Sequence, residues 1–136
     1  MKHIGCDYLK DVTSATQLRE TCNRIIARMK SAGIEFDSIA FRGMSGALVV
    51  PTVALETGKE LLLVRKSDNS HSSYKVEGNA ASNRYVIVDD LICSGDTIRA
   101  IQSTITEQLP KAQLVGIFLY WQKHTDFFQD IPVFIC

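Results

Sequence analysis

Residues 85–98 read YVIVDDLICSGDTI and form the most informative run of the chain. The first four are apolar and either aromatic or β-branched, which is typical of a strand buried on both faces of a parallel sheet. Asp89 and Asp90 come where such a strand would end. Small and hydroxylated residues at 93–97 lead into apolar residues at helical spacing, which are Ile98, Ile101, Ile105 and Leu109. The run therefore predicts a strand, an acidic pair, a tight loop and a helix.

The tight loop and the acidic pair suit different parts of one ligand. Free backbone N–H groups and the helix dipole at the start of a helix favour a phosphate. Carboxylates would repel that phosphate, but they accept hydrogen bonds from vicinal hydroxyls and bind hydrated Mg²⁺. A ligand with a phosphate near a ribose diol satisfies both requirements. The alternative is an ordinary buried strand in which Asp89 or Asp90 caps a turn.

This order of residues resembles the phosphoribosyl pyrophosphate (PRPP) motif of the type I phosphoribosyltransferases, in which an apolar strand is followed by two acids, three residues and Thr/Ser-Gly-x-Thr. The resemblance implies an α/β fold with three layers around a parallel sheet. It also implies that Asp89 and Asp90 hold the ribose hydroxyls and, through water, the Mg²⁺ that accompanies PRPP. The 5′-phosphate is expected on the amides and hydroxyls of the next loop, which contains Ser94, Gly95, Asp96 and Thr97.

Length and charge set the general class of the protein. The 136 residues are expected to form one domain, residues 1–136, around a single core. Fifteen basic and fifteen acidic residues cancel, which argues against binding to nucleic acid or to a membrane surface. No apolar run approaches the length of a bilayer span, and the first ten residues lack a signal-peptide core. The four cysteines are far apart and fit free thiols in a reducing cytoplasm.

Helical spacing, strand-like runs and turn residues predict the remaining elements. A helix is expected from an N-cap at Thr13-Ser14 to Gly33, with Cys22 and Met29 in the core. Residues 1–12 are interpreted as an edge strand or a lead-in. The other predicted elements are strands at 38–41, 60–64, 113–120 and 131–135, a helix at 47–56 that contains Pro51, and a loop at 121–130. Strands that alternate with helices indicate a parallel sheet with its site at the carboxyl ends of the strands.

A second predicted strand runs into a glycine-rich loop, FRGMSG at 41–46. The Arg42 guanidinium suits a diphosphate, and Gly43 and Gly46 allow backbone amides to approach it. The loop resembles the pyrophosphate loop of the same family, in which a basic or small residue precedes glycine. The alternative is a common strand–turn–helix without a ligand.

Residues 64–78, VRKSDNSHSSYKVEG, resemble the flexible flap of adenine phosphoribosyltransferases, although the second half lacks one leucine and one tyrosine of that pattern and the middle is shorter. By this resemblance the basic pair Arg65 and Lys66 holds phosphates of PRPP, and Glu77 acts near the base or the leaving group. Three sources are open for the wall around the base, which are the flap around Tyr74, the loop at 121–128 and a neighbouring subunit. The polar span 65–84 is long enough to be a lid, and the alternative is a solvated surface loop.

The base is predicted from two positions. Cys93 stands where the 6-oxopurine enzymes usually have an aspartate, so the resemblance favours adenine. Leu91 is then the expected apolar wall beneath the base. Most of the hood that covers the nucleobase in this family is missing, because only about a dozen residues precede the first predicted helix. Asp96 replaces a commoner glycine or lysine, and a carboxylate near a phosphate costs energy. An outward orientation that favours the helix start is one role open to it.

Aromatic and histidine side chains are open to two interpretations each. The aromatic residues of the loop at 121–130 either stack on the base or close the core. They are Trp121, Phe127 and Phe128. The histidines have no metal-ligand spacing, so surface or core roles are expected for His3, His71 and His124.

The resemblance implies a nucleobase phosphoribosyltransferase of purine salvage, with adenine favoured. A ring nitrogen would displace pyrophosphate from PRPP–Mg²⁺, with Glu77, Asp89 and Asp90 as catalytic residues. A homodimer is expected, because open apolar walls favour self-association. Two alternatives from other classes are a PRPP-sensing regulator and a non-catalytic scaffold on the same fold.

Overall fold

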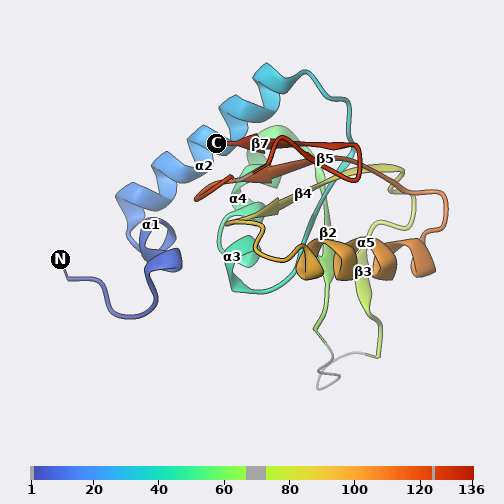
Figure 1. Cartoon of the computed structure of the whole chain (residues 1–136), viewed down its shortest axis with the longest axis horizontal. Helices are drawn as coiled ribbons and strands as arrows, with labels where there is room; N and C mark the ends of the chain where they lie inside the picture. Colours follow the sequence, from blue (N-terminus) through green and yellow to red (C-terminus); the bar gives the residue numbers. More distant parts are fainter. Residues whose placement is uncertain (1, 67–72, 124) are drawn as a thin grey trace.

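The predicted acidic strand, β4 (Arg84–Asp89), lies at the centre of a seven-stranded sheet in the computed structural model, which describes residues 2–66, 73–123 and 125–136 (Figure 1). The strand order is β3-β2-β1-β4-β5-β7-β6. The five inner strands pair in parallel, and the short outer strands β3 and β6 pair antiparallel. The elements are η1 (Asp7–Leu9), α1 (Lys10–Thr13), α2 (Ala15–Ala32), β1 (Ser38–Phe41), α3 (Met44–Ala47), α4 (Val50–Thr57), β2 (Glu60–Val64), β3 (Val76–Gly78), β4, α5 (Asp96–Gln108), β5 (Gln113–Leu119), β6 (Phe127–Phe128) and β7 (Ile131–Ile135).

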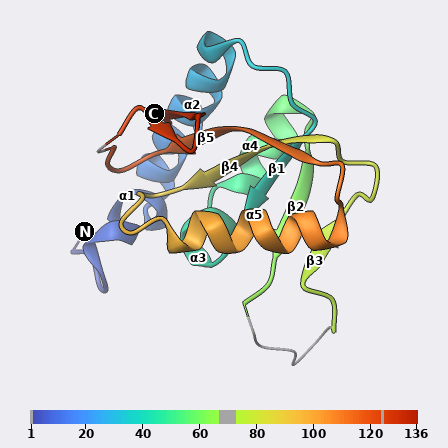
Figure 2. The ribbon, with the colours of Figure 1, turned by 45° about the vertical axis from the view of Figure 1, so that its right-hand side comes forward.

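Helices cover both faces of the sheet, so the predicted three-layer α/β fold is confirmed, with a sheet that is mixed only at its edges (Figure 2). Successive side chains of a strand point to opposite faces. Tyr85 and Ile87 of β4 accordingly pack in the core shared with α5, while Val86 and Val88 pack in the core shared with α2 and α4. All four are buried, which explains why this strand is apolar without interruption.

The first long helix, α2, has the predicted bounds and a buried stripe. Cys22 and Met29 are both buried in the core on the α2 face, as predicted. The helix ends at Gly33, whose left-handed backbone (φ 66°) suits glycine at this position.

The helix predicted at 47–56 is two helices. The first, α3, is a single turn that begins at Met44, and α4 starts anew at Val50. Pro51 lies in the first turn of α4, where its missing N–H leaves no hydrogen bond unmade. Proline therefore marks a late first turn rather than a bend in one longer helix.

The prediction of an edge strand within residues 1–12 is wrong, because η1 and α1 occupy part of this segment. Val12 is buried and Leu9 packs against the same core, so their three-residue spacing reports a helical face. Two segments predicted as loops contain short strands, β3 in the 65–84 span and β6 in the 121–130 span. The middle of the predicted lid, residues 67–72, lies outside the described residues, as does His124.

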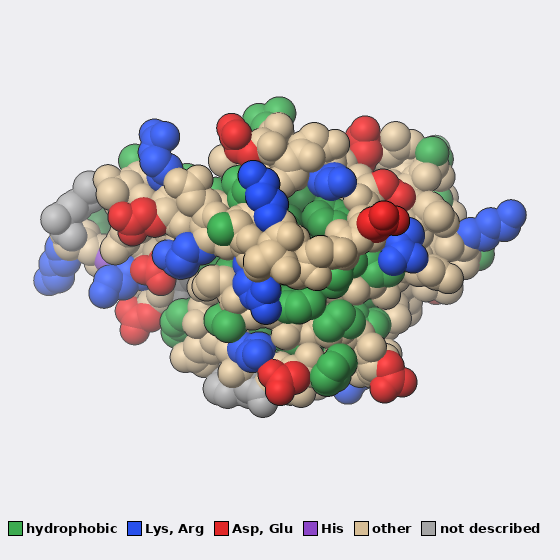
Figure 3. Space-filling view, turned by 90° about the horizontal axis from the view of Figure 1, so that it is seen from above, with side chains coloured by type: hydrophobic (Ala, Val, Ile, Leu, Met, Phe, Trp, Pro, Cys, Tyr) green, Lys and Arg blue, Asp and Glu red, His purple; other side chains and the backbone are tan. Residues whose placement is uncertain are grey.

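The surface carries charges of both signs. On the face in Figure 3, basic and acidic side chains are interspersed, and hydrophobic side chains gather in its lower half. In the described ranges, no helix combines the length and the apolar character that crossing a bilayer requires.

The β6–β7 hairpin yields a stability prediction. Its two turn residues, Gln129 and Asp130, both have positive φ (50° and 67°). Two-residue hairpin turns of this kind favour Asn and Gly, since other side chains are strained in the left-handed region. Gln129→Asn should raise the free energy of unfolding by roughly 0.5–1 kcal/mol in urea titrations. The same change at Gln102, which lies within α5, is the control and should give no gain.

Candidate functional site

The site lies outside the carboxyl ends of β1 and β4, which are neighbours at the centre of the sheet. The chain leaves β1 towards β2 on one side and leaves β4 towards β5 on the other. Loops that diverge in this way leave a crevice, which is where open α/β sheets bind ligands. Here the crevice is an open pocket of about 320 Å³. Its lining consists of Arg42, Gly43, Met44, Ser45, Lys66 and residues 89–98.

Asp89 is the buried member of the acidic pair, with 6% of its surface exposed. Its Oδ1 accepts hydrogen bonds from the Ser45 hydroxyl (2.8 Å) and the Asp90 amide (2.9 Å). Burial, together with the neighbouring Asp90 carboxylate, raises the pKa of Asp89 to about 7. The Asp90 carboxylate is more exposed and accepts the Leu91 amide (2.8 Å). The pair therefore offers one buried and one accessible carboxyl group side by side.

Ser45 connects this pair to two other loops. Its hydroxyl donates to Asp89, and its carbonyl accepts the Tyr120 hydroxyl at 2.8 Å. Tyr120 is buried at the end of β5, and its pKa is raised by burial and by the nearby Asp90 and Asp89 carboxylates, so it remains a hydrogen-bond donor. This chain of hydrogen bonds fixes the loop after β1 against the ends of β4 and β5.

The predicted phosphate loop has the expected shape. Gly95 has a left-handed backbone (φ 87°) and immediately precedes α5. The Asp96 amide lies 3.3 Å from the Ser94 hydroxyl oxygen, which tightens the turn. Together with Thr97, these residues line the pocket at the start of a thirteen-residue helix, whose dipole favours an anion.

Two cations face this region. Arg42 and Lys66 line the pocket, and the Lys66 side chain lies against Gly43, since a Cβ there would be 3.4 Å from Lys66 Cε. Neither cation forms an ion pair with an acid within the part of the chain that the structure describes. Both are therefore available to an anionic ligand. Leu91 and Cys93 also line the pocket, with Cys93 exposed.

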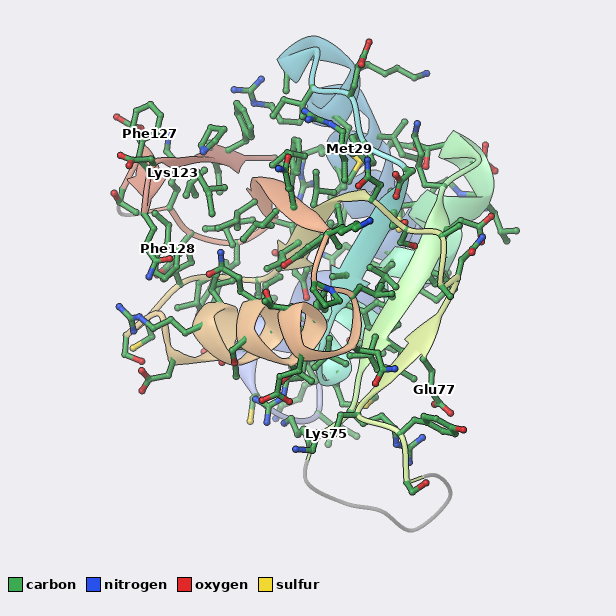
Figure 4. The ribbon with its side chains drawn as sticks, turned by 90° about the vertical axis from the view of Figure 1, so that its right-hand side faces the viewer. Met29, Lys75, Glu77, Lys123, Phe127 and Phe128 are labelled. Carbon is green, nitrogen blue, oxygen red and sulfur yellow. The ribbon has the colours of Figure 1, made fainter. Side chains whose placement is uncertain are left out.

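Three predicted site residues are not brought into the pocket lining. Arg65 and Glu77 form an ion pair with each other (3.2 Å) across β2 and β3. In Figure 4, Glu77 points outward from β3. Tyr74 is 64% exposed. In this structure Glu77 pairs with Arg65, and neither side chain lines the pocket.

The sequence interpretation missed several lining residues. Met44, Ser45, Ile92 and Ile98 line the pocket, and Tyr120 supports it from below. Ser45 lies inside the FRGMSG motif, so its hydroxyl in a ligand loop was a usable signal. No signal in the sequence pointed to Tyr120, because nothing in the neighbouring residues shows that the end of β5 lies against the loop after β1.

The donor set fits Mg²⁺ only as part of a metal–ligand complex. Within the described ranges, no group of three or more His, Cys, Asp or Glu side chains comes together. Mg²⁺ is commonly held by one or two carboxylates plus substrate phosphates and water. Asp89 and Asp90 match that arrangement.

Comparisons with known proteins agree with this geometry, although no protein-family model matches the chain. The chain is 34% identical over 104 residues to the transcriptional regulator GfcR of Methanocaldococcus jannaschii, covering 71% of this chain and 49% of that protein. It is 28% identical over 115 residues to the orotate phosphoribosyltransferase of Pyrococcus furiosus, covering 83% and 62%. The chain thus spans about half to three-fifths of the length of these curated relatives.

Solved structures show the same fold. The adenine phosphoribosyltransferase of Saccharomyces cerevisiae, solved with adenine and an imino-altritol bisphosphate, has a TM-score of 0.72 at 24% identity, over 95% of this chain and 83% of that one. The orotate phosphoribosyltransferase of Francisella tularensis has a TM-score of 0.71 at 14% identity, over 91% and 67%. The fold is that of the type I phosphoribosyltransferases. The chain therefore has the fold of these enzymes and is similar in sequence to the regulator and the orotate phosphoribosyltransferase named above.

The acidic pair yields a pH prediction. Because the Asp89 pKa is about 7 in the folded protein and about 4 in unfolded chains, the folded state binds this proton more tightly. Its contribution to stability is complete below pH 4 and is lost as the pH rises through 7. Asp89→Asn keeps an acceptor for Ser45 and carries no charge. Its stability relative to wild type should therefore rise by on the order of 2 kcal/mol between pH 4 and pH 8, in urea titrations without metal.

Glu107→Gln, on the exposed side of α5, is the control. A difference between Asp89→Asn and wild type that stays constant from pH 4 to pH 8 would show that Asp89 is an ordinary carboxylate.

Proposed function

We propose that this protein transfers the 5-phosphoribosyl group of PRPP to a nucleobase and releases pyrophosphate. The observation that carries the proposal is the single pocket that unites an acidic pair, a helix-start loop and two cations from the ends of three neighbouring strands. A ligand that matches it has a diol near the acids, a monophosphate near the loop and a diphosphate near the cations. PRPP has these three groups in one molecule.

The proposed reaction develops negative charge on the departing diphosphate, and the cations of the pocket can stabilise that charge. A ring nitrogen of the base bonds to C1′ while the C1′–oxygen bond to the diphosphate breaks, and pyrophosphate leaves with the electron pair. The base loses its N–H proton to solvent or to a nearby acceptor. Arg42 and Lys66 would stabilise the departing charge, and Asp89 and Asp90 would orient the ribose hydroxyls. Mg²⁺, held through water by the same acids, would add to the neutralisation of the diphosphate.

The identity of the base is a finer proposal. Adenine is favoured by the flap resemblance at 64–78 and by the neutral Cys93 in the pocket. Orotate is the rival, since relatives at 27–28% identity are named orotate phosphoribosyltransferases. If adenine is the substrate, a place in purine salvage follows.

A regulatory function is the second candidate. The observation that favours it is the 34% identity to a transcriptional regulator. Such a protein would bind PRPP as a signal without turnover. The balanced net charge of this chain and the mixed charges on the face in Figure 3 favour the enzyme as the first candidate.

We also propose a homodimer in a reducing, cytoplasmic compartment. The four cysteines are free thiols. Leu55 is 85% exposed on α4 beside Pro51 and Leu61, a setting that suits a partner surface. Analytical ultracentrifugation of wild type and Leu55→Glu tests this, and a monomeric wild type at micromolar concentration would refute the dimer.

The substrate panel is the central test of the proposed function. PRPP, Mg²⁺ and the protein should yield a nucleotide with adenine, measured beside hypoxanthine, guanine, uracil and orotate. Orotate turnover alone would show that the flap resemblance misleads. PRPP binding without turnover of any base would identify the regulator, and absence of PRPP binding would refute both.

Asp90 is expected to matter for PRPP itself. Its accessible carboxylate would accept a ribose hydroxyl, so Asp90→Asn should weaken PRPP binding more than tenfold in calorimetry with Mg²⁺. Asp7→Asn, an exposed change outside the pocket, serves as the control. Unchanged affinity in Asp90→Asn would remove the acidic pair from the site.

A further inference from the structure

Arg99, in the first turn of α5, contacts the predicted phosphate loop but does not line the pocket. One guanidinium nitrogen, Nη1, lies 3.1 Å from the Ser94 carbonyl oxygen and 3.3 Å from Asp96 Oδ1. Arg99 is absent from the pocket lining, whereas Ser94 and Asp96 belong to it. The guanidinium therefore bridges two residues of the loop without itself lining the pocket.

Phe128 of β6 completes this contact. Its ring centroid lies 5.3 Å from the Arg99 guanidinium carbon. A Cβ at Gly95 would lie 2.7 Å from the Phe128 ring and 3.1 Å from Arg99 Nη1. Gly95 is thus enclosed between the ring and the guanidinium, so both its missing side chain and its positive φ are required. Figure 4 shows Phe128 between the hairpin and the start of α5.

Stability alone does not account for this arrangement. The side chains of Arg99 and Asp96 are 52% and 85% exposed, and exposed ion pairs contribute little to folding. The contact instead fixes the orientation of the peptide group between Ser94 and Gly95. In a planar trans peptide the C=O and the next N–H point in opposite directions. A Ser94 carbonyl held towards Arg99 therefore turns the Gly95 N–H away from Arg99, and Gly95 lines the pocket whereas Arg99 does not.

We propose that Arg99 is a positioning residue of the phosphate loop, seated on Phe128, that keeps the backbone amides turned towards the ligand. The same guanidinium balances the Asp96 carboxylate, which explains how an acid is accommodated beside an expected phosphate. The inference rests on the proposed function, because its effect is measured on a phosphate ligand. It adds a requirement outside the sequence motif of the loop, which is the aromatic ring of Phe128 on the edge strand β6.

The proposal predicts different effects at two anion-binding positions, which are the loop at 94–97 and the cations Arg42 and Lys66. Loss of Arg99 should disorder the amides at 94–97 and leave Arg42 and Lys66 in place. In calorimetry, Arg99→Ala should weaken ribose 5-phosphate binding about tenfold, the scale of a lost charge-assisted hydrogen bond. Inorganic pyrophosphate binding with Mg²⁺ should change by less than about twofold, and it also reports that the variant is folded.

Matched variants make the test specific. Arg28→Ala removes a similar contact of an arginine with a phenylalanine ring, 4.7 Å from Phe134, outside the pocket, and should leave both affinities unchanged. Arg99→Lys keeps the charge but replaces the guanidinium that lies over the Phe128 ring with a more strongly hydrated ammonium, so it should stay weak. Full affinity in Arg99→Lys would show that charge alone matters and would overturn the proposal.

The remaining outcomes separate this inference from the proposed function. If wild type binds neither ribose 5-phosphate nor pyrophosphate, the proposed function itself fails. If wild type binds ribose 5-phosphate and Arg99→Ala binds it equally well, only the positioning role is refuted. Equal weakening of both ligands in Arg99→Ala would indicate a general loss of structure and would likewise overturn the role.

Discussion

The site depends on one constraint, which is that β1 and β4 end side by side while their chains leave in opposite directions. This divergence opens the pocket and forces a carboxylate, Asp89, into a nearly buried position. A buried acid must be hydrogen-bonded or protonated. Ser45 and the Asp90 amide meet that requirement, and Tyr120 in turn holds Ser45. The loops of three strands are therefore fixed to one another through Ser45, whose hydroxyl bonds Asp89 and whose carbonyl bonds Tyr120.

The charges at this end of the sheet are separated by strand. The acids come from β4, whereas Arg42 follows β1 and Lys66 follows β2. The proposed ligand matches this separation, because it has phosphates for the cations and hydroxyls for the acids. Arg65 differs from its neighbour Lys66, because Glu77 on β3 already neutralises it. The short antiparallel strand β3 thus decides which of two adjacent basic residues is available to a ligand.

The fold provides the pocket but does not decide the function of the protein. Proteins of similar sequence are named as a regulator and as orotate transferases, and proteins of similar fold include adenine transferases. Function lies in the site rather than in the fold. The wall around the base would decide between these outcomes, and Leu91, Ile92 and Cys93 are the lining residues that directly follow the acidic pair.

The sequence alone determined the features whose signals are local. The apolar run 85–88, the acids after it and the small loop before α5 are each written in adjacent residues, so the central strand and the candidate phosphate loop could be predicted. Tertiary structure decided the features whose partners are distant. Tyr120 meets Ser45 across 75 residues, and Phe128 reaches Gly95 from another strand. β3 and β6 exist only because a neighbouring strand supplies their hydrogen bonds. No period or motif within a few residues encodes contacts of this kind, because they arise only when the sheet has formed.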